Sequence, residues 1–236
     1  MIDAVVCFKW RSRFPYRTTF LPETVNVLRR MVARRYPHPH EFICVTDDAE
    51  GLDAEIRVVP LWDEFADVPS PNGQTRPSCY RRLKVFSREM ASVLGQRFVV
   101  IDLDVVFTGD VTSLWHRRED FVIYGDTHPT TPYNGSMFLL RAGARAQVYE
   151  TFDPKRSPAT THQAGMFGSD QAWISFCLGA GESKWGRRDG VYSFRNHVQP
   201  TGALPADARM VVFHGRCKPW DDDVQQRHPW VSECWQ

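Results

Sequence analysis

The sequence lacks the long apolar runs and the excess of one charge that mark several classes of protein. None of its 236 residues lies in a stretch approaching the roughly 18–20 consecutive apolar residues that a membrane-spanning helix requires. The 29 lysines and arginines nearly balance the 28 aspartates and glutamates, which argues against a general nucleic-acid-binding protein. Residues 1–4 carry an acid and no basic region, which is not the pattern of a secretory signal.

Cysteine is sparse and is not arranged for a structural metal. The six cysteines include no Cys-x-x-Cys pair, which disfavours a zinc ribbon. Cys7 and Cys44 each lie within an apolar run, which predicts reduced, buried thiols in a cytoplasmic protein; disulfides remain the alternative. A glycine-rich phosphate-binding loop of the usual kind is also missing.

What is present is typical of one globular α/β domain. Apolar residues make up 42% of the chain and charged residues 24%, so we expect a single domain over residues 1–236. Apolar runs alternate with helical patterns, which predicts a mostly parallel central sheet flanked by helices. Strands are expected at 4–8, 41–46, 98–101, 121–124, 137–140 and 210–213. Helices are expected at 22–36, 80–94 and 170–178.

The most informative motif follows the expected strand 98–101, where the chain reads Asp102-Leu103-Asp104. Side chains two residues apart on a strand share a face, and ligands of open α/β sheets bind at the carboxyl ends of strands. Two carboxylates held there repel each other unless a cation lies between them. Oxygen ligands suit Mg²⁺ or Mn²⁺, whereas the structural alternative is a strand end whose acids cap a turn.

Other polar residues lie where the expected elements begin or end. Arg82 and Lys218 can neutralise phosphate charge, and the guanidinium of Arg82 can do so through a bidentate fork. Asn134 can hydrogen-bond a sugar hydroxyl, and His214 has a metal-competent imidazole. A basic helix face, a plain turn and a structural histidine are the corresponding alternatives.

In this order the motifs resemble those of the GT-A fold glycosyltransferases. The resemblance is closest to the retaining family 8, which includes glycogenin and the bacterial lipopolysaccharide galactosyltransferases. It runs from about residue 80 to 220, and the combination is far more specific than any one motif. The residues that match the family's motifs are Tyr80, Arg82 and Leu83, then Asp102 and Asp104, then Asn134 and Gly135, then Asp170 and Gln171, and finally Lys218, Pro219 and Trp220.

The chain departs from the family pattern at three places. The closing motif, His-x-x-Gly-x-x-Lys-Pro-Trp, keeps its glycine as Gly215 but has Val212 at the histidine position. His214 lies two residues further on, which is the same face of a strand. Ala172 replaces the third acid of Asp-Gln-Asp, and the first strand ends in residues 8–10, Phe-Lys-Trp, instead of small or acidic residues.

The resemblance implies a metal-dependent glycosyltransferase that moves a sugar from a nucleotide sugar, most simply a UDP-sugar, to a carbohydrate or other hydroxyl acceptor with retention. A nucleotidyltransferase, a sugar-nucleotide hydrolase and an inactive UDP-binding module are the alternatives. The metal, Mn²⁺ or Mg²⁺, is expected on Asp102, Asp104 and His214. The donor is expected to contact Phe8, Lys9, Trp10, Arg82, Asp102, Leu103, Asp104, Gly215 and Lys218, while Asn134, Asp170 and Gln171 face the transferred sugar and the acceptor.

Overall fold

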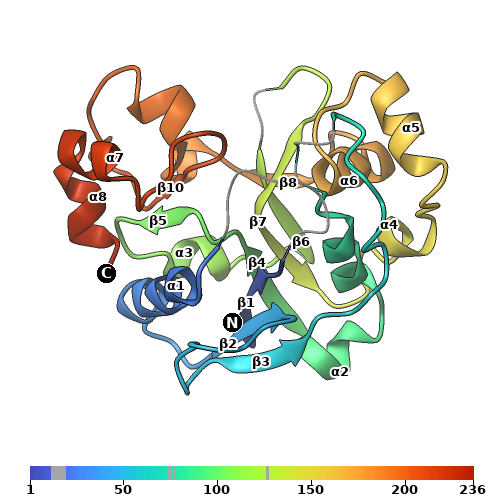
Figure 1. Ribbon diagram of the computed structural model, residues 1–236, viewed down its shortest axis with the longest axis horizontal. Helices are drawn as coiled ribbons and strands as arrows, with labels where there is room; N and C mark the ends of the chain where they lie inside the picture. The colour runs from blue at the N-terminus through green and yellow to red at the C-terminus, as the bar shows by residue number, and fades with distance from the viewer. Residues whose placement is uncertain (12–19, 74–75, 77, 126–127) are drawn as a thin grey trace.

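The computed structural model describes residues 1–11, 20–73, 76, 78–125 and 128–236. Its centre is a seven-stranded sheet in the order β3-β2-β1-β4-β7-β6-β8 (Figure 1). Neighbouring strands are parallel except that β7 runs antiparallel to both β4 and β6. The strands are β1 (Ala4–Lys9), β2 (Glu41–Thr46), β3 (Arg57–Pro60), β4 (Arg97–Ile101), β6 (Phe121–Gly125), β7 (Tyr133–Arg141) and β8 (Ser183–Trp185).

A smaller sheet of three strands lies beside the central one, in the order β5-β10-β9 (Figure 1). Its strands are β5 (Val105–Phe107), β9 (Val191–Ser193) and β10 (Met210–Val212). Since β5 begins four residues after β4 ends, the chain passes from the central sheet to the smaller one through residues 102–104. The expected aspartate pair therefore lies where the two sheets meet.

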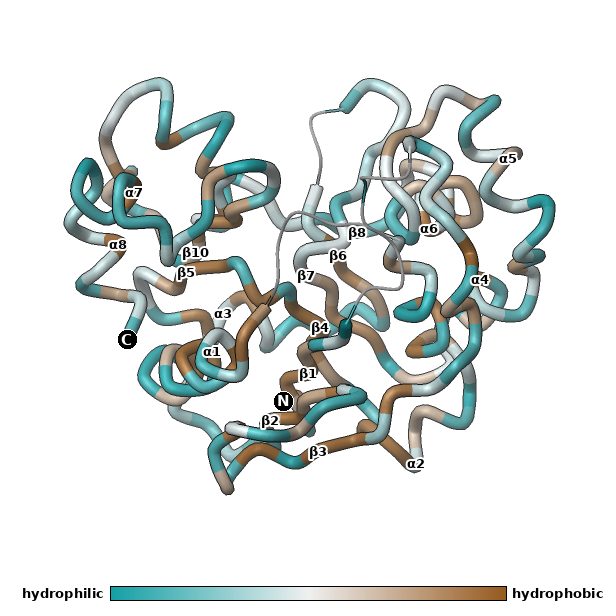
Figure 2. The backbone as a smooth tube through the Cα atoms, viewed as in Figure 1, coloured by the Kyte–Doolittle hydropathy of each residue, from teal (hydrophilic) through white to brown (hydrophobic). Residues whose placement is uncertain are grey.

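Helices cover the central sheet on both faces, and alternate strand residues fill two separate cores. In β4, Val99 and Ile101 belong to one core, whereas Phe98 and Val100 belong to the other. The first core packs under α1 (Pro22–Arg35), α3 (Thr112–Trp115), α7 (Asp222–Arg227) and α8 (Pro229–Cys234). The second packs under η1 (Tyr80–Phe86), α2 (Met90–Leu94), α4 (Gln147–Glu150) and α6 (Asp170–Leu178), and α5 (Ser157–Gln163) packs against α6. Figure 2 shows the hydrophobic strands at the centre and the hydrophilic turns outside.

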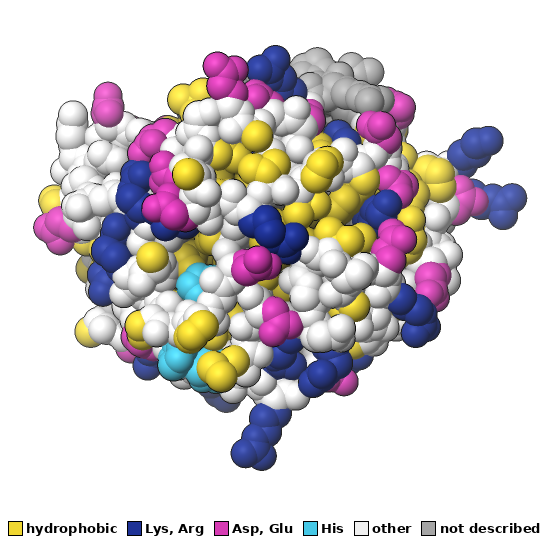
Figure 3. Space-filling view, turned by 90° about the horizontal axis from the view of Figure 1, so that it is seen from below, with side chains coloured by type: hydrophobic (Ala, Val, Ile, Leu, Met, Phe, Trp, Pro, Cys, Tyr) yellow, Lys and Arg dark blue, Asp and Glu magenta, His cyan; other side chains and the backbone are white. Residues whose placement is uncertain are grey.

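The surface charges and the unpaired cysteines match the expectations drawn from the composition. Positive and negative side chains are intermixed on the face seen in Figure 3, as expected for a chain whose net charge is +1. All six cysteines are unpaired, and Cys7 and Cys44 are buried. Among the described residues, no helix combines the length and the apolar character needed to cross a membrane.

Two predicted elements differ from the structure. The single helix expected over 80–94 is a 3₁₀ helix, η1, followed by the short α2, because Ser87 between them is extended (ψ 150°). The strand expected at 137–140 is longer and begins at Tyr133, so Asn134 and Gly135 lie inside β7 and not in a turn before it. The short strands β3, β5, β8 and β9 were not predicted, since runs of three or four residues carry too little periodicity.

Candidate active site

Polar side chains from six separate segments meet in a cavity of about 730 Å³ at the carboxyl end of β4. This is the position at which open α/β sheets bind ligands. A cavity of this size is large enough for a nucleotide-sized molecule. The lining includes nine of the predicted site residues: Arg82, Asp102, Asp104, Asn134, Asp170, Gln171, His214, Gly215 and Lys218.

The aspartate pair is fixed by backbone pairing on both sides. The N–H of Asp102 donates to the carbonyl of Ser136 (2.9 Å), which continues the ladder between β4 and β7. The carbonyl of Asp104 accepts the N–H of Phe213 (2.9 Å), which ties it to the end of β10. Leu103 is buried in the core between them. Residues 102–104 connect β4 to β5, and both carboxylates line the cavity whereas the intervening leucine packs in the core.

The side chain of Arg82 contacts three groups that line the cavity. Its guanidinium donates through Nη1 to Asp102 Oδ1 (2.6 Å), through Nη2 to the carbonyl of Gly135, and lies with Nε 3.4 Å from Asp170 Oδ2. The side chains of Arg82 and Asp170 are each only 7% exposed. Burial opposes the charge of Arg82, but Asp102 and Asp170 outweigh it and raise the pKa of the guanidinium. One buried cation thus joins carboxylates from two distant motifs.

Asp170 is the first residue of α6 and is held close to β7. Burial raises the pKa of its carboxyl, and Arg82 only partly offsets this effect. A Cβ atom on Gly135 would lie 3.4 Å from Asp170 Oδ2, so a glycine allows β7 to pass close to this carboxylate. Asn134 accepts the N–H of Ser136 (2.9 Å) through Oδ1 and is buried, whereas Gln171 donates to the carbonyl of Phe167 (3.2 Å).

Lys218 is the second buried cation of the cavity. Its ammonium group contacts Asp104 Oδ2 and lies 3.4 Å from the carbonyl oxygen of Phe213. Burial raises the pKa of the Asp104 carboxyl, and the charge of Lys218 opposes that increase. Each aspartate of the pair is thus matched by a buried cation.

The two carboxylates fit a divalent cation, and His214 lines the same cavity, so its role as a third ligand stays a prediction. Nε2 of His214 lies 2.7 Å from Ser193 Oγ, and Val212 is buried within β10. The described residues contain no group of three or more His, Cys, Asp or Glu side chains able to hold a metal. Mg²⁺ is commonly held by one or two carboxylates together with substrate phosphates, and Asp102 and Asp104 suit that mode.

Four predicted donor-binding residues lie outside this cavity. Leu103 packs in the core, and Phe8 makes edge contacts with the rings of Trp10 and Trp62 at 6.1 and 5.7 Å. Lys9 is buried and donates to the carbonyl of Asp48 (2.6 Å). The nucleotide-binding role of Phe8, Lys9 and Trp10 therefore stays a prediction.

Several lining residues were missed because no motif marks them. Asn72 accepts the N–H of Gly168 (2.9 Å), and the Arg76 guanidinium lies 5.7 Å from the ring centre of Phe167. The ring of His128 stacks on the same phenylalanine at 6.0 Å. Arg195 lies in the π-helix η3 (Phe194–Val198). Their only sequence signal is polarity within loops, which is too common to select them.

Solved glycosyltransferases share this architecture. The galactosyltransferase LgtC, solved in complex with donor and acceptor sugar analogs, superposes with a TM-score of 0.65 and 15% identity over 99% of this chain and 96% of that chain. Mouse xyloside xylosyltransferase 1 superposes with a TM-score of 0.57 and 14% identity over 92% of this chain and 98% of that chain. The glycosyltransferase GlyE of Streptococcus pneumoniae TIGR4 superposes with a TM-score of 0.59 and 13% identity over 98% of this chain and 60% of that chain.

The sequence matches no family model and no curated protein. The structural likeness nevertheless spans nearly the whole chain. The chain therefore has the GT-A fold, which confirms the fold implied by the order of its motifs. At these identities the likeness establishes the fold alone.

Proposed function

We propose that this GT-A chain is a glycosyltransferase that transfers a sugar from a UDP-sugar, with Mn²⁺ or Mg²⁺, to a hydroxyl acceptor with retention of configuration. The observation that carries the proposal is Arg82, which joins the aspartate pair to Asp170 across one cavity. This contact supports a site in which the diphosphate lies beside Asp102 and Asp104 and the sugar lies beside Asp170. Similarity to LgtC and other glycosyltransferases supports the same conclusion.

The charges around the cavity support a diphosphate and a divalent cation together. Three carboxylates, those of Asp102, Asp104 and Asp170, line the cavity. Four cationic side chains line it as well: Arg76, Arg82, Arg195 and Lys218. A nucleoside diphosphate sugar brings about two negative charges, which a divalent cation on Asp102 and Asp104 would neutralise. When bound, the metal would supply Lewis-acid stabilisation of the diphosphate.

The chain's own residues have distinct roles in this proposal. Lys218 binds the departing diphosphate, and Arg82 holds Asp102 and Asp170 in a fixed relation. Asn134 and Gln171 hydrogen-bond the transferred sugar, and Asp170 lies against its anomeric side. In the transfer the acceptor oxygen bonds to the anomeric carbon, the bond to the diphosphate breaks with its electron pair on the diphosphate oxygen, and that oxygen takes the proton from the acceptor hydroxyl.

The proposal also includes the cellular location. Six unpaired cysteines, two of them buried on neighbouring strands β1 and β2, fit a reducing compartment. We therefore propose that the reaction takes place in the cytoplasm.

Product analysis tests the reaction class. Purified protein is incubated with individual UDP-sugars, Mn²⁺ and a panel of sugar acceptors, and the products are followed by NMR. The proposal expects UDP and a new glycoside whose anomeric configuration matches the donor. Release of pyrophosphate, or of free sugar alone with every acceptor, would instead identify a nucleotidyltransferase or a hydrolase.

A further inference from the structure

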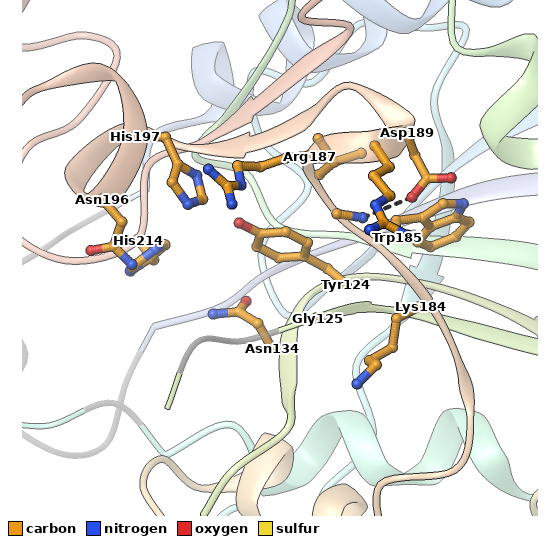
Figure 4. A pocket seen from close by; sticks show the side chains of 13 residues that line it. Tyr124, Gly125, Asn134, Lys184, Trp185, Arg187, Asp189, Asn196, His197 and His214 are labelled. Atoms are coloured by element: carbon orange, nitrogen blue, oxygen red, sulfur yellow. Dashed lines mark hydrogen bonds between the residues drawn. The ribbon is translucent and has the colours of Figure 1, made fainter. Parts of the chain in front are cut away.

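A second cavity of about 400 Å³ adjoins the first and shares Asn134 and His214 with it. Its walls come from the ends of β6 and β8, from the 3₁₀ turn η2 (Arg187–Asp189) and from η3. Neither the sequence motifs nor the proposed donor site accounts for it. Figure 4 shows Tyr124 in the middle of the cavity, with Asn134, Asn196 and His214 on one side and Lys184, Trp185 and Asp189 on the other.

The lining of the second cavity is strongly cationic. The side chains of Lys184, Arg187 and Arg188 are exposed, and none of them forms an ion pair within the described residues. Of the described residues that line this cavity, only Asp189 carries a carboxylate, and it already accepts the N–H of Gly186 (3.0 Å) and lies 3.7 Å from Arg117 Nη1. Three cations therefore line this cavity, and the one acid among its described lining residues already has other partners.

Neutral hydrogen-bonding groups complete the lining. The backbone N–H of Ser193 donates to Nδ1 of His197 (2.9 Å), so the neutral imidazole carries its proton on Nε2 and is a donor there. Figure 4 shows the Arg187 guanidinium between this ring and the hydroxyl end of Tyr124. An arginine fork, a phenol and an imidazole together suit a ligand that is both anionic and rich in hydroxyls.

We propose that the second cavity binds the acceptor, and that the acceptor is a sugar carrying a phosphate monoester. The identification of this ligand as the acceptor rests on the proposed function. The phosphate faces Lys184, Arg187 and Arg188. The attacking hydroxyl lies at the shared end, beside Asn134 and His214, where it meets the first cavity. A phosphate is favoured over a single carboxylate because three unpaired cations exceed what one carboxylate needs.

Calorimetric titration tests this assignment with glucose 6-phosphate as the probe, and with glucose, glucuronate and inorganic phosphate as its comparisons. Titrations are run with and without UDP and Mn²⁺. Arg187→Ala should weaken glucose 6-phosphate binding by about tenfold or more, as expected for a lost charge-assisted contact. Arg156→Ala is the matched control, since its side chain is 87% exposed and lines neither cavity.

The outcomes separate this inference from the proposed function. Binding of glucose 6-phosphate that Arg187→Ala weakens and Arg156→Ala leaves unchanged supports the assignment, even if UDP fails to bind. Equal binding of glucose and glucose 6-phosphate, or equal losses in the two variants, would overturn it. Inorganic phosphate or glucuronate binding as tightly as glucose 6-phosphate would also overturn the assignment to a phosphorylated sugar.

Discussion

Removal of the buried Arg82 charge should destabilise the fold as well as the site. In Arg82→Met, the Asp170 carboxylate keeps its burial but loses the cation 3.4 Å away, and Asp102 loses its 2.6 Å hydrogen bond. Breaking a buried ion pair from one side typically costs about 3–5 kcal/mol. For a chain of this size each kcal/mol lowers the unfolding midpoint by about 2–4 °C, so we expect a fall of about 6–20 °C.

A double-mutant cycle measures whether the loss comes from the ion pair. Urea unfolding at pH 7, followed by near-UV circular dichroism, gives the free energy of unfolding of Arg82→Met, Asp170→Asn and the double variant. Because Asp170→Asn removes the charge that Arg82→Met leaves unpaired, the double variant should lose about 1–3 kcal/mol less than the sum of the single variants.

Arg141→Met is the matched control for the same substitution at an exposed pair. Arg141 Nε lies 2.5 Å from Asp120 Oδ1, but these two side chains are 52% and 51% exposed. Exposed pairs contribute about 0–1 kcal/mol. A loss in Arg82→Met no greater than that in Arg141→Met would refute the reasoning, because the short contacts of Arg82 would then contribute no more than a surface pair.

Three further predictions concern separate parts of the chain. Asp102→Asn should abolish metal-stimulated turnover while leaving the circular dichroism spectrum unchanged, and full activity would contradict the proposed metal site. Gly190→Ala should destabilise by about 1–3 kcal/mol more than Gly202→Ala in urea unfolding; both glycines have φ above +70°, but only at Gly190 would the new Cβ lie 2.5 Å from the carbonyl of Asp207. Burial, aided by the neighbouring Arg227 charge, lowers the pKa of His228. The stability that the neutral imidazole contributes is therefore complete above the ordinary pKa of about 6.5, and it is lost as the pH falls through the lowered pKa. The drop in unfolding free energy between pH 7.5 and 5.5 should therefore be smaller in His228→Gln, and an unchanged drop would be evidence against this cause.

The central strands and the main cavity were predictable because several local signals agreed. The strands at 41–46 and 98–101 are apolar runs, and their burial on both faces follows from that composition. The spacing of Asp102 and Asp104 predicts that they share a face, and both carboxylates line one cavity. The motif order then placed Arg82, Asp170 and Lys218 in the same site, and the structure brings all of them together.

The rest depended on contacts that have no local signature. His214 lines the expected cavity, but its contact with Ser193 Oγ (2.7 Å) involves a strand too short to predict. Lys9 follows an apolar run, yet it contacts Asp48 at the end of β2 and not the cavity. The second cavity combines β6 and β8 of the central sheet with η2 and η3, which flank β9 of the smaller sheet. In each case the decisive partner is distant in sequence.

Thermal unfolding with UDP and Mn²⁺, against either alone and against ADP and GDP, tests the central claim most directly. A ligand at about 100 times its dissociation constant stabilises by roughly 2.7 kcal/mol, which corresponds to a rise of about 5–11 °C in the midpoint. The account predicts such a rise with UDP and Mn²⁺ together, and a much smaller one with either alone or with ADP and GDP. An unchanged midpoint with every nucleotide and metal would contradict a nucleotide-sugar site in the cavity built around Arg82.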